Sequence, residues 1–418
     1  MTGTGGGHRG HTLWLAGICM ARAGSSVMSM AYPAVLASVQ EEWGLSFTAA
    51  GTINSATQAG TALSLVVLSV LADSLGPRAV FLGSAVLAAV TSFLIPIFAH
   101  GHATALVLFF LSAVAIAGTY TPGVMLIAAR FEPARRGGAV GWFLASSSVG
   151  YVLALAIGGL VVAHAGWRAA LFVLALGPVG CLLLSLVLFR GRTERGAVPS
   201  SRFTWDTGLG GNRAAQLMIA GYVFHSWELL GMWAWTPAFM TAVLVAHGTA
   251  PTQAAGLGAG LTALFHVMGI AASSTGGWLS DRWGRTAVIA GMMIVSSACS
   301  FSFGWLLGAP FALVLVAGCL YGFSALGDSP VYSTGITETV PPARLGSVLA
   351  IRSLLGFGAG AIAPSVFGMV LDLYQDRTAV AAWGWGFSVL GIGGVLGLAS
   401  ILWLRALPEA RRLAGGKR

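Results

Sequence analysis

The stretch GGWLSDRWGRT, residues 276–286, places one aspartate and two arginines between two long apolar runs. Only 8% of the 418 residues are charged and 56% are hydrophobic, whereas a soluble protein of this length carries about a quarter charged residues. A chain with so few charges cannot cover a globule with polar surface. The stretch is therefore expected to connect two helices that cross a membrane, each of which needs roughly 20 apolar residues.

The apolar runs between such polar clusters lack the two-residue alternation of a membrane barrel, which favours helices. They predict an all-α integral membrane protein with twelve transmembrane helices. The predicted spans are residues 12–36, 46–71, 78–99, 103–129, 138–163, 167–190, 214–243, 253–279, 286–308, 310–337, 345–371 and 380–405. The longest polar connection, residues 191–213, divides the chain into an N-terminal six-helix bundle (1–190) and a C-terminal six-helix bundle (214–418).

The 22 lysines and arginines are distributed unevenly over the predicted connections. Nearly all lie on the side that holds both termini and the 191–213 connection. Arg168 and Arg377 fall on the other side, and Arg22 and Arg352 lie inside spans. By the positive-inside rule, both termini are expected in the cytoplasm and the protein in the cytoplasmic (inner) membrane. The net charge of +9 therefore indicates topology, and no nucleic-acid partner is expected.

The opening stretch has a counterpart 208 residues earlier, SVLADSLGPRA at residues 69–79, in which Asp73 aligns with Asp281. A second pair of related segments follows at an offset of 209, with EPARRGGAV at residues 132–140 and PPARLGSVL at residues 341–349. Two motifs that recur in the same order predict a duplicated six-helix unit, the plan of many transporters.

The second copy contains the pattern G-x-L-x-D-R-x-G-R, which resembles the loop signature of the major facilitator superfamily. The residues of the pattern are Gly277, Leu279, Asp281, Arg282, Gly284 and Arg285. The first copy is degenerate, with Ser69 for the first glycine and Ser74 for the basic residue, and GWRAALF at residues 166–172 also resembles the superfamily. The resemblance covers essentially the whole chain. It implies the superfamily fold of two pseudo-symmetric six-helix bundles.

The resemblance also implies a gating role for these loops, because each acid can lie against the positive N-terminal end of a helix in the opposite half. Asp73 is expected to face the start of the eleventh span and Asp281 the start of the fifth, and Glu338 is a predicted partner of Arg282 or Arg285. The alternative is that these charges only fix topology and turn geometry. The predicted gating residues are Asp73, Arg78, Asp281, Arg282, Arg285, Glu338 and Arg352.

Charges inside a membrane span are costly, so each one is a candidate functional residue. Four occur: Arg22 in the first span, Glu228 in the seventh, Asp328 in the tenth and Arg352 in the eleventh. In the superfamily the first, fourth, seventh and tenth spans line the central cavity. Arg22, Glu228 and Asp328 are therefore expected to face it, whereas Arg352 is expected in a gate or an ion pair.

Arg22 is the candidate anchor for an anionic substrate, since the planar guanidinium fork fits a carboxylate or a phosphate. The alternative is an ion pair of Arg22 with Asp328 or Glu228. Glu228 is the candidate proton-coupling carboxylate, and its alternative is a static ion pair with an arginine. His225 lies three residues from Glu228 on the same helix face and is expected to share or tune its proton. Asp328 is expected to be a second proton site or the partner of Arg22.

Uncharged polar residues in the spans are further candidates for substrate contact, although interhelical hydrogen bonding is their alternative role. These residues are Tyr32, Asn54, Gln58, Tyr120, Thr121, His266 and Tyr321. The sequence contains no nucleotide-binding loop and no recognisable catalytic or metal-binding cluster. No cofactor, no metal and no enzymatic activity are expected.

Together these residues predict proton-coupled transport of a small organic anion, such as a carboxylate, by alternating access. The expected partners are the substrate, protons and the lipid bilayer, and a monomer is expected because both bundles belong to one chain. The alternative is proton-coupled efflux of a hydrophobic or cationic compound, held by Glu228 or Asp328 and the tryptophans of the seventh span. A transition-metal carrier with His and Met ligands, and a sensor built on a transporter scaffold, are further alternatives.

Overall fold

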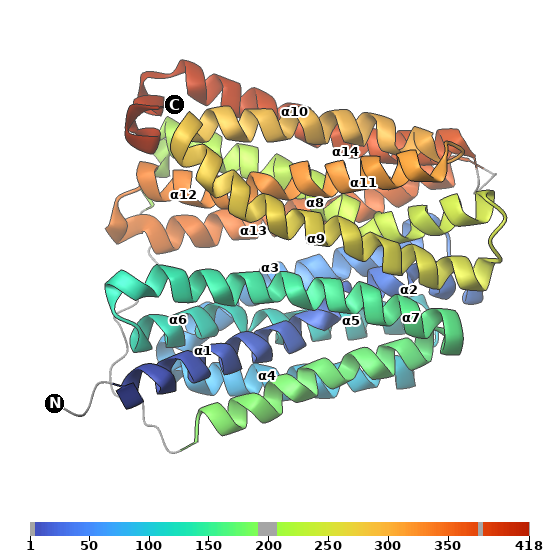
Figure 1. Cartoon of the computed structure of the whole chain (residues 1–418), viewed down its shortest axis with the longest axis horizontal. Helices are drawn as coiled ribbons and strands as arrows, with labels where there is room; N and C mark the ends of the chain where they lie inside the picture. Colours follow the sequence, from blue (N-terminus) through green and yellow to red (C-terminus); the bar gives the residue numbers. More distant parts are fainter. Residues whose placement is uncertain (1–4, 191–206, 375–378, 418) are drawn as a thin grey trace.

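The computed structural model describes residues 5–190, 207–374 and 379–417, and every regular element in these ranges is a helix. Figure 1 shows two groups of long helices, one from each half of the chain. The first group contains α1 (Gly5–Ser26), η1 (Val27–Met30), α2 (Ala31–Glu42), α3 (Phe47–Leu75), α4 (Pro77–Phe98), α5 (His102–Ala117), α6 (Tyr120–Arg130) and α7 (Pro133–Leu188). The second group contains η2 (Leu209–Gly211), α8 (Arg213–Ala246), α9 (Pro251–Trp283), α10 (Arg285–Phe303), η3 (Gly304–Leu306), α11 (Phe311–Gly327), α12 (Ser329–Thr339), α13 (Pro342–Asp372), α14 (Val380–Ala406) and η4 (Pro408–Gly416).

Ten helices in the described ranges are long and apolar enough to cross a membrane. One of them, α7, contains the non-helical residue Gly166 (φ 80°, ψ 171°), where the chain turns back along the bundle (Figure 1). The path α1–η1–α2 is broken by a 3-10 turn, which the sequence did not predict. The all-α membrane fold is confirmed. The total of twelve spans stays a prediction. Counting α7 as two spans and the α1–η1–α2 path as one span would give that total.

The repeated loop motif forms the same turn in both halves. Gly76 separates α3 from α4 with φ 87°, and Gly284 separates α9 from α10 with φ 97°. Positive φ values of this kind are readily adopted only by glycine. The glycine that both copies share therefore allows the tight reversal between consecutive helices.

Two helical paths are interrupted at equivalent positions of the repeat. The path α5–α6 breaks at Gly118 and Thr119, and the path α11–α12 breaks at Asp328. Thr119 and Asp328 are 209 residues apart, which is the offset of the second motif pair. Both side chains are buried. Each break therefore places a polar side chain inside an apolar bundle.

The start of α1 and the C-terminal η4 lie at the same end of the bundle, which we call the terminal end (Figure 1). At the opposite end the two halves touch backbone to backbone. A Cβ atom on Gly51 of α3 would collide with the carbonyl oxygen of Pro364 in α13, and one on Gly159 of α7 with that of Gly256 in α9. Only glycine allows helices to approach this closely.

A carboxylate from the second half caps a helix of the first half at this opposite end. Asp372, the last residue of α13, accepts hydrogen bonds from the backbone N–H groups of Phe47 and Thr48, at 2.8 Å each. The hydroxyl of Thr48 donates a third hydrogen bond to it, at 2.6 Å. The negative charge therefore lies at the positive N-terminal end of α3. The two halves are joined here by polar as well as close-packed contacts.

Candidate functional site

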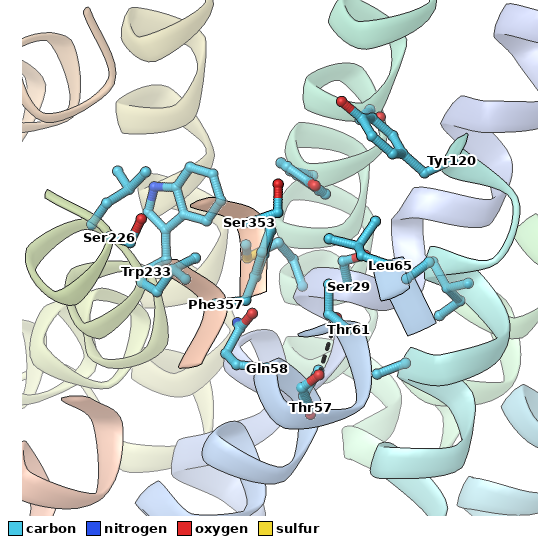
Figure 2. A pocket seen from close by; sticks show the side chains of 18 of the residues that line it. Ser29, Thr57, Gln58, Thr61, Leu65, Tyr120, Ser226, Trp233, Ser353 and Phe357 are labelled. Atoms are coloured by element: carbon cyan, nitrogen blue, oxygen red, sulfur yellow. Dashed lines mark hydrogen bonds between the residues drawn. The ribbon is translucent and has the colours of Figure 1, made fainter. Parts of the chain in front are cut away.

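A cavity of about 350 Å³ lies between the two halves, within the size range of small-molecule sites. Helices of the first half and α8, α11, α12 and α13 of the second half form its wall. Lining residues that Figure 2 labels are Ser29, Thr57, Gln58, Thr61, Leu65, Tyr120, Ser226, Trp233, Ser353 and Phe357. The wall combines hydroxyl groups with aromatic rings, so it can contact polar and apolar parts of one solute.

The cavity lies on the terminal side of the contacts that close the opposite end. On α3 it begins at Thr57, past the contact at Gly51, and on α13 it reaches Phe357, short of the contact at Pro364. On α7 the lining residues extend as far as Tyr151, short of the contact at Gly159. The structure is therefore closed between the cavity and the opposite end.

Arg22 of α1 lies in the cavity wall, with 6% of its surface exposed. Its Nε donates a hydrogen bond to Ser147 Oγ (2.8 Å), and its Nη1 donates to Thr119 Oγ1 (2.9 Å) and to the carbonyl oxygen of Ile116 (3.3 Å). The ring of Tyr120 lies 5.3 Å from the guanidinium carbon. All these partners are uncharged. Among the described residues, Arg22 forms no ion pair in this conformation.

Arg352 of α13 also lines the cavity, although its span was not among the four expected to do so. Its guanidinium carbon lies 3.6 Å from the ring centroid of Tyr222, and Nη1 donates a hydrogen bond to Ser333 Oγ (3.1 Å). Nε is buried and makes no hydrogen bond within the described part of the chain. Arg352 likewise forms no ion pair with a described carboxylate. The cavity therefore holds an arginine from each half.

His225 of α8 lines the cavity, and its ring nitrogens contact two residues at the break between α11 and α12. Nδ1 lies 3.0 Å from Asp328 Oδ1, and Nε2 lies 2.7 Å from Ser329 Oγ. Asp328 itself does not belong to the wall, contrary to expectation. The histidine therefore lies between the cavity and a buried carboxylate.

Glu228 is turned away from the cavity, although it was expected to face it. Ser300 donates a hydrogen bond to its Oε1 (2.6 Å) and Ser296 to its Oε2 (3.2 Å), both from α10. Tyr321 extends this network through a 2.5 Å contact with the Ser300 hydroxyl. No described arginine or lysine pairs with Glu228. His225 and Glu228 share one helix, yet their partners lie on different helices.

Of the predicted substrate contacts, Arg22, Gln58 and Tyr120 line the cavity, whereas Tyr32, Asn54, Thr121, His266 and Tyr321 are absent from its wall. The hydroxyl of Tyr32 donates to the carbonyl oxygen of Ala50 (3.0 Å). His266 packs against the ring of Trp233 at a centroid distance of 5.0 Å. The hydroxyls of Tyr32 and Tyr321 thus bond other helical residues, whereas the amide nitrogen of Asn54 has no partner among the described residues.

Apart from Arg352, the predicted gating residues of the second half lie together at the terminal end. Arg285 pairs with Asp281 and, at 2.8 Å, with Glu338, whereas Arg282 lies over the ring of Trp278. The C-terminal segment joins the cluster, because the backbone N–H of Ala414 donates to Glu338 (3.0 Å) and Lys417 Nζ to the carbonyl oxygen of Asp281 (2.7 Å). In the first half Asp73 is exposed and Arg78 half-buried. Of the 191–213 connection, residues 191–206 lie outside the described residues.

The opposite end carries a small charged cluster within the first half. Glu42 accepts hydrogen bonds from Trp167 Nε1 (2.5 Å) and from Arg168 Nη1 (2.6 Å). The hydrogen bond from Trp167, aided by the hydrogen bond and charge of Arg168, holds the pKa of the Glu42 carboxyl below its usual value of 4.5. Arg168 and Glu42 are both well exposed, so this pair is solvated.

Sequence reasoning missed the neutral residues that hold the charged ones: Thr119, Ser147, Tyr222, Ser329 and Ser333. Serine and threonine are too frequent in this chain to stand out. For Thr119 one signal exists, because it is the repeat equivalent of Asp328.

Comparisons with known proteins agree with this architecture. The family model described as Major Facilitator Superfamily matches residues 14–252. A protein of Bacillus subtilis (strain 168) that is named for niacin and nicotinamide transport, NiaP, is 22% identical over 381 residues, covering 88% of this chain and 89% of its own length. A Streptomyces coelicolor protein named as a transporter, SCO4007, is 29% identical over 300 residues, covering 68% of this chain and 63% of its own length.

Solved structures share the fold. A bacterial homologue of the human lysosomal transporter Spinster, in an inward-facing and occupied conformation, superposes with a TM-score of 0.77 at 15% identity, covering 96% of this chain and 98% of that one. The nucleoside transporter NupG gives a TM-score of 0.70 at 15% identity, covering 94% and 99%. The expected superfamily membership and fold are thereby confirmed.

Proposed function

The chain belongs to the Major Facilitator Superfamily and is a multi-pass membrane transporter rather than an enzyme, and from this premise we propose that it carries a small organic carboxylate. The observation that carries the proposal is the charge of the cavity. Its described lining residues include Arg22 and Arg352 but no aspartate or glutamate. Buried charge without a counter-ion is costly, so an anion gains most by entering. The same feature disfavours a cationic substrate.

The Bacillus subtilis relative supports the carboxylate class, because niacin is a pyridine carboxylate. Arg22 is the proposed anchor, since two of its nitrogens are fixed by neutral partners while Nη2 makes no hydrogen bond with the described residues. An arginine held in this way can offer a charge-assisted bond to a carboxylate. Gln58 and Tyr120 lie in the same wall and supply further polar contacts.

The proposed driving force is a proton gradient. His225 contacts Asp328 behind the wall, and an imidazole beside a carboxylate can share a proton with it. Glu228 also lies outside the cavity wall, where Ser296 and Ser300 donate hydrogen bonds to it. It is proposed as a further proton site rather than a substrate contact. The substrate and the proton would then enter by way of the same cavity.

The proposed mechanism is alternating access between two bundles, residues 1–190 and 214–418, joined by the 191–213 connection. The arginine distribution favours a cytoplasmic terminal end in the inner membrane, so the conformation described is open toward the cytoplasm in this proposal. Asp73 and Asp281 are proposed to reach helix starts of the other half when that end closes. Asp281 would leave Arg285 to do so. A monomer contains the complete cavity.

The test measures ligand-induced thermal stabilisation of the purified protein, because binding to the native state raises its apparent stability. The probes are nicotinate, its neutral amide nicotinamide, benzoate and the lipophilic cation tetraphenylphosphonium. We expect the two carboxylates to stabilise the wild type, and Arg22→Gln to weaken their binding at least about tenfold through loss of a charge-assisted bond.

The matched control is Arg168→Gln, which removes an exposed arginine at the opposite end and should leave binding unchanged. Stabilisation by tetraphenylphosphonium alone would overturn the proposal. Equal carboxylate binding in wild type and Arg22→Gln would remove Arg22 from the site.

A further inference from the structure

The two arginines of the cavity come from opposite halves of the molecule. Arg22 belongs to α1 and Arg352 to α13, and both are more than nine-tenths buried. Both guanidinium-bearing side chains line the same cavity of about 350 Å³, and the ring of Tyr120 lies 5.3 Å from the guanidinium carbon of Arg22. Two like charges in a low-dielectric space repel each other. Their joint presence therefore calls for more than one acceptor group between them.

Arg352 retains hydrogen-bonding capacity after its protein contacts are counted. Ser333 accepts one hydrogen bond and the ring of Tyr222 faces the guanidinium, yet Nε is buried without a partner in the described part of the chain, and Nη2 has none there either. A buried donor without an acceptor costs about 1–3 kcal/mol. A ligand that accepts from Arg352 removes this cost.

We propose that Arg352 is a second acceptor subsite, and that the substrate bridges the two halves with a carboxylate at Arg22 and a second acceptor group at Arg352. This inference rests on the proposed function and narrows it. The substrate class is a small planar acid with a second acceptor on its ring, either a ring nitrogen or a second carboxylate. The ring of Trp233 lies in the same wall and is suited to pack against such a ring.

A bridging ligand also couples binding to movement. It contacts α1 in the first half and α13 in the second, so its bonds depend on the distance between the halves. A ligand can shift a conformational equilibrium only through different contacts in the two states. A one-acceptor ligand at Arg22 alone lacks this dependence.

The experiment compares benzoate with isophthalate. Isophthalate carries a second carboxylate on the ring atom that corresponds to the ring nitrogen of nicotinate. Dissociation constants are measured by thermal stabilisation in wild type, Arg352→Gln and Arg352→Lys. In wild type, isophthalate is expected to bind about tenfold more tightly than benzoate, the effect of one charge-assisted bond. Arg352→Gln should abolish this preference, because isophthalate loses more affinity than benzoate, and Arg352→Lys should restore part of it.

Three results separate the inference from the proposed function. Wild type that binds neither probe nor nicotinate overturns both. Benzoate and isophthalate of equal affinity in wild type overturn the second subsite alone. If benzoate and isophthalate lose equal affinity in Arg352→Gln, the second subsite is also overturned, because Arg352 then has a structural role. Detectable benzoate binding shows that the variant is folded.

Discussion

In the first half the helix break at Thr119 faces Arg22, whereas in the second half the break at Asp328, 209 residues later, faces His225. A serine completes each centre, Ser147 beside the arginine and Ser329 beside the histidine. The architecture is therefore repeated, while the chemistry is not. One centre pairs a permanent cation with neutral groups, and the other pairs a titratable ring with a carboxylate.

The difference shows how a duplicated fold can divide two tasks. A hydroxyl beside Arg22 fixes the guanidinium without neutralising it, so its charge is left for a ligand. In the proposed function, the carboxylate beside His225 instead offers a proton a buried site, and this carboxylate is not part of the cavity wall. The residue at the helix break is thus proposed to decide whether a half binds anions or protons.

The strongest test makes the first half resemble the second. Thr119→Asp would place a carboxylate where an oxygen already lies 2.9 Å from Arg22 Nη1. Close charge pairs couple by about 1.5–7 kcal/mol, and a coupling of about 3 kcal/mol would weaken the binding of nicotinate and benzoate about 100-fold. Titration of the purified protein measures this change. Thr119→Asn is the neutral control and should stay within about tenfold of wild type, whereas anion binding retained in Thr119→Asp would refute the proposed role of Arg22.

The converse change removes the acid from the second half. In Asp328→Asn the carboxylate beside His225 becomes an amide, so proton-driven accumulation should disappear while exchange of internal for external substrate continues. One coupled proton supports about tenfold accumulation per pH unit, because a pH unit corresponds to about 1.4 kcal/mol. Uptake of labelled nicotinate into proteoliposomes, with and without a one-unit gradient, measures both activities. Undiminished accumulation would place coupling elsewhere, with Glu228 as the next candidate.

These centres mark the limit of what the sequence predicts. Long apolar runs and the loop motif were sufficient to predict the all-α membrane fold and the superfamily, because both can be read from short stretches of sequence. The direction in which a buried charged side chain points depends on contacts with residues that are distant in sequence. Arg352 faces the cavity although its span was not among the four expected to line it, and His225 meets an acid 103 residues away rather than Glu228 on its own helix face. Asp372 caps a helix that begins 325 residues earlier. No local pattern records such contacts.

A smaller effect is expected from the second partner of Arg22. Ser147→Ala removes the acceptor of the 2.8 Å hydrogen bond from Nε but keeps the charge. One such hydrogen bond is worth about 0.5–1.5 kcal/mol, so the benzoate dissociation constant should rise about two- to tenfold. Ser185→Ala, in the part of α7 after the turn at Gly166, is the matched control, because among the described residues that hydroxyl bonds the carbonyl oxygen of Cys181. A loss as large as that expected for Thr119→Asp would show that Ser147 does more than orient the arginine.

The smallest effect concerns an arginine that already has a carboxylate, Arg168 with Glu42 at the opposite end. The folded protein holds the pKa of Glu42 below 4.5, so the pair stabilises the fold above that pH and loses its effect as the pH falls through the lowered pKa. Glu42→Gln should therefore be less stable than wild type at pH 7. The difference in unfolding free energy should be less than about 1 kcal/mol, because both groups are exposed, and it should vanish in acid. Thermal unfolding of both proteins from pH 7 to pH 3 measures this. If the stability difference persists at pH 3, it arises from the hydrogen bond with Trp167 rather than from the charge of Glu42. The pairing of Arg168 with Glu42 would then have no measurable effect on stability.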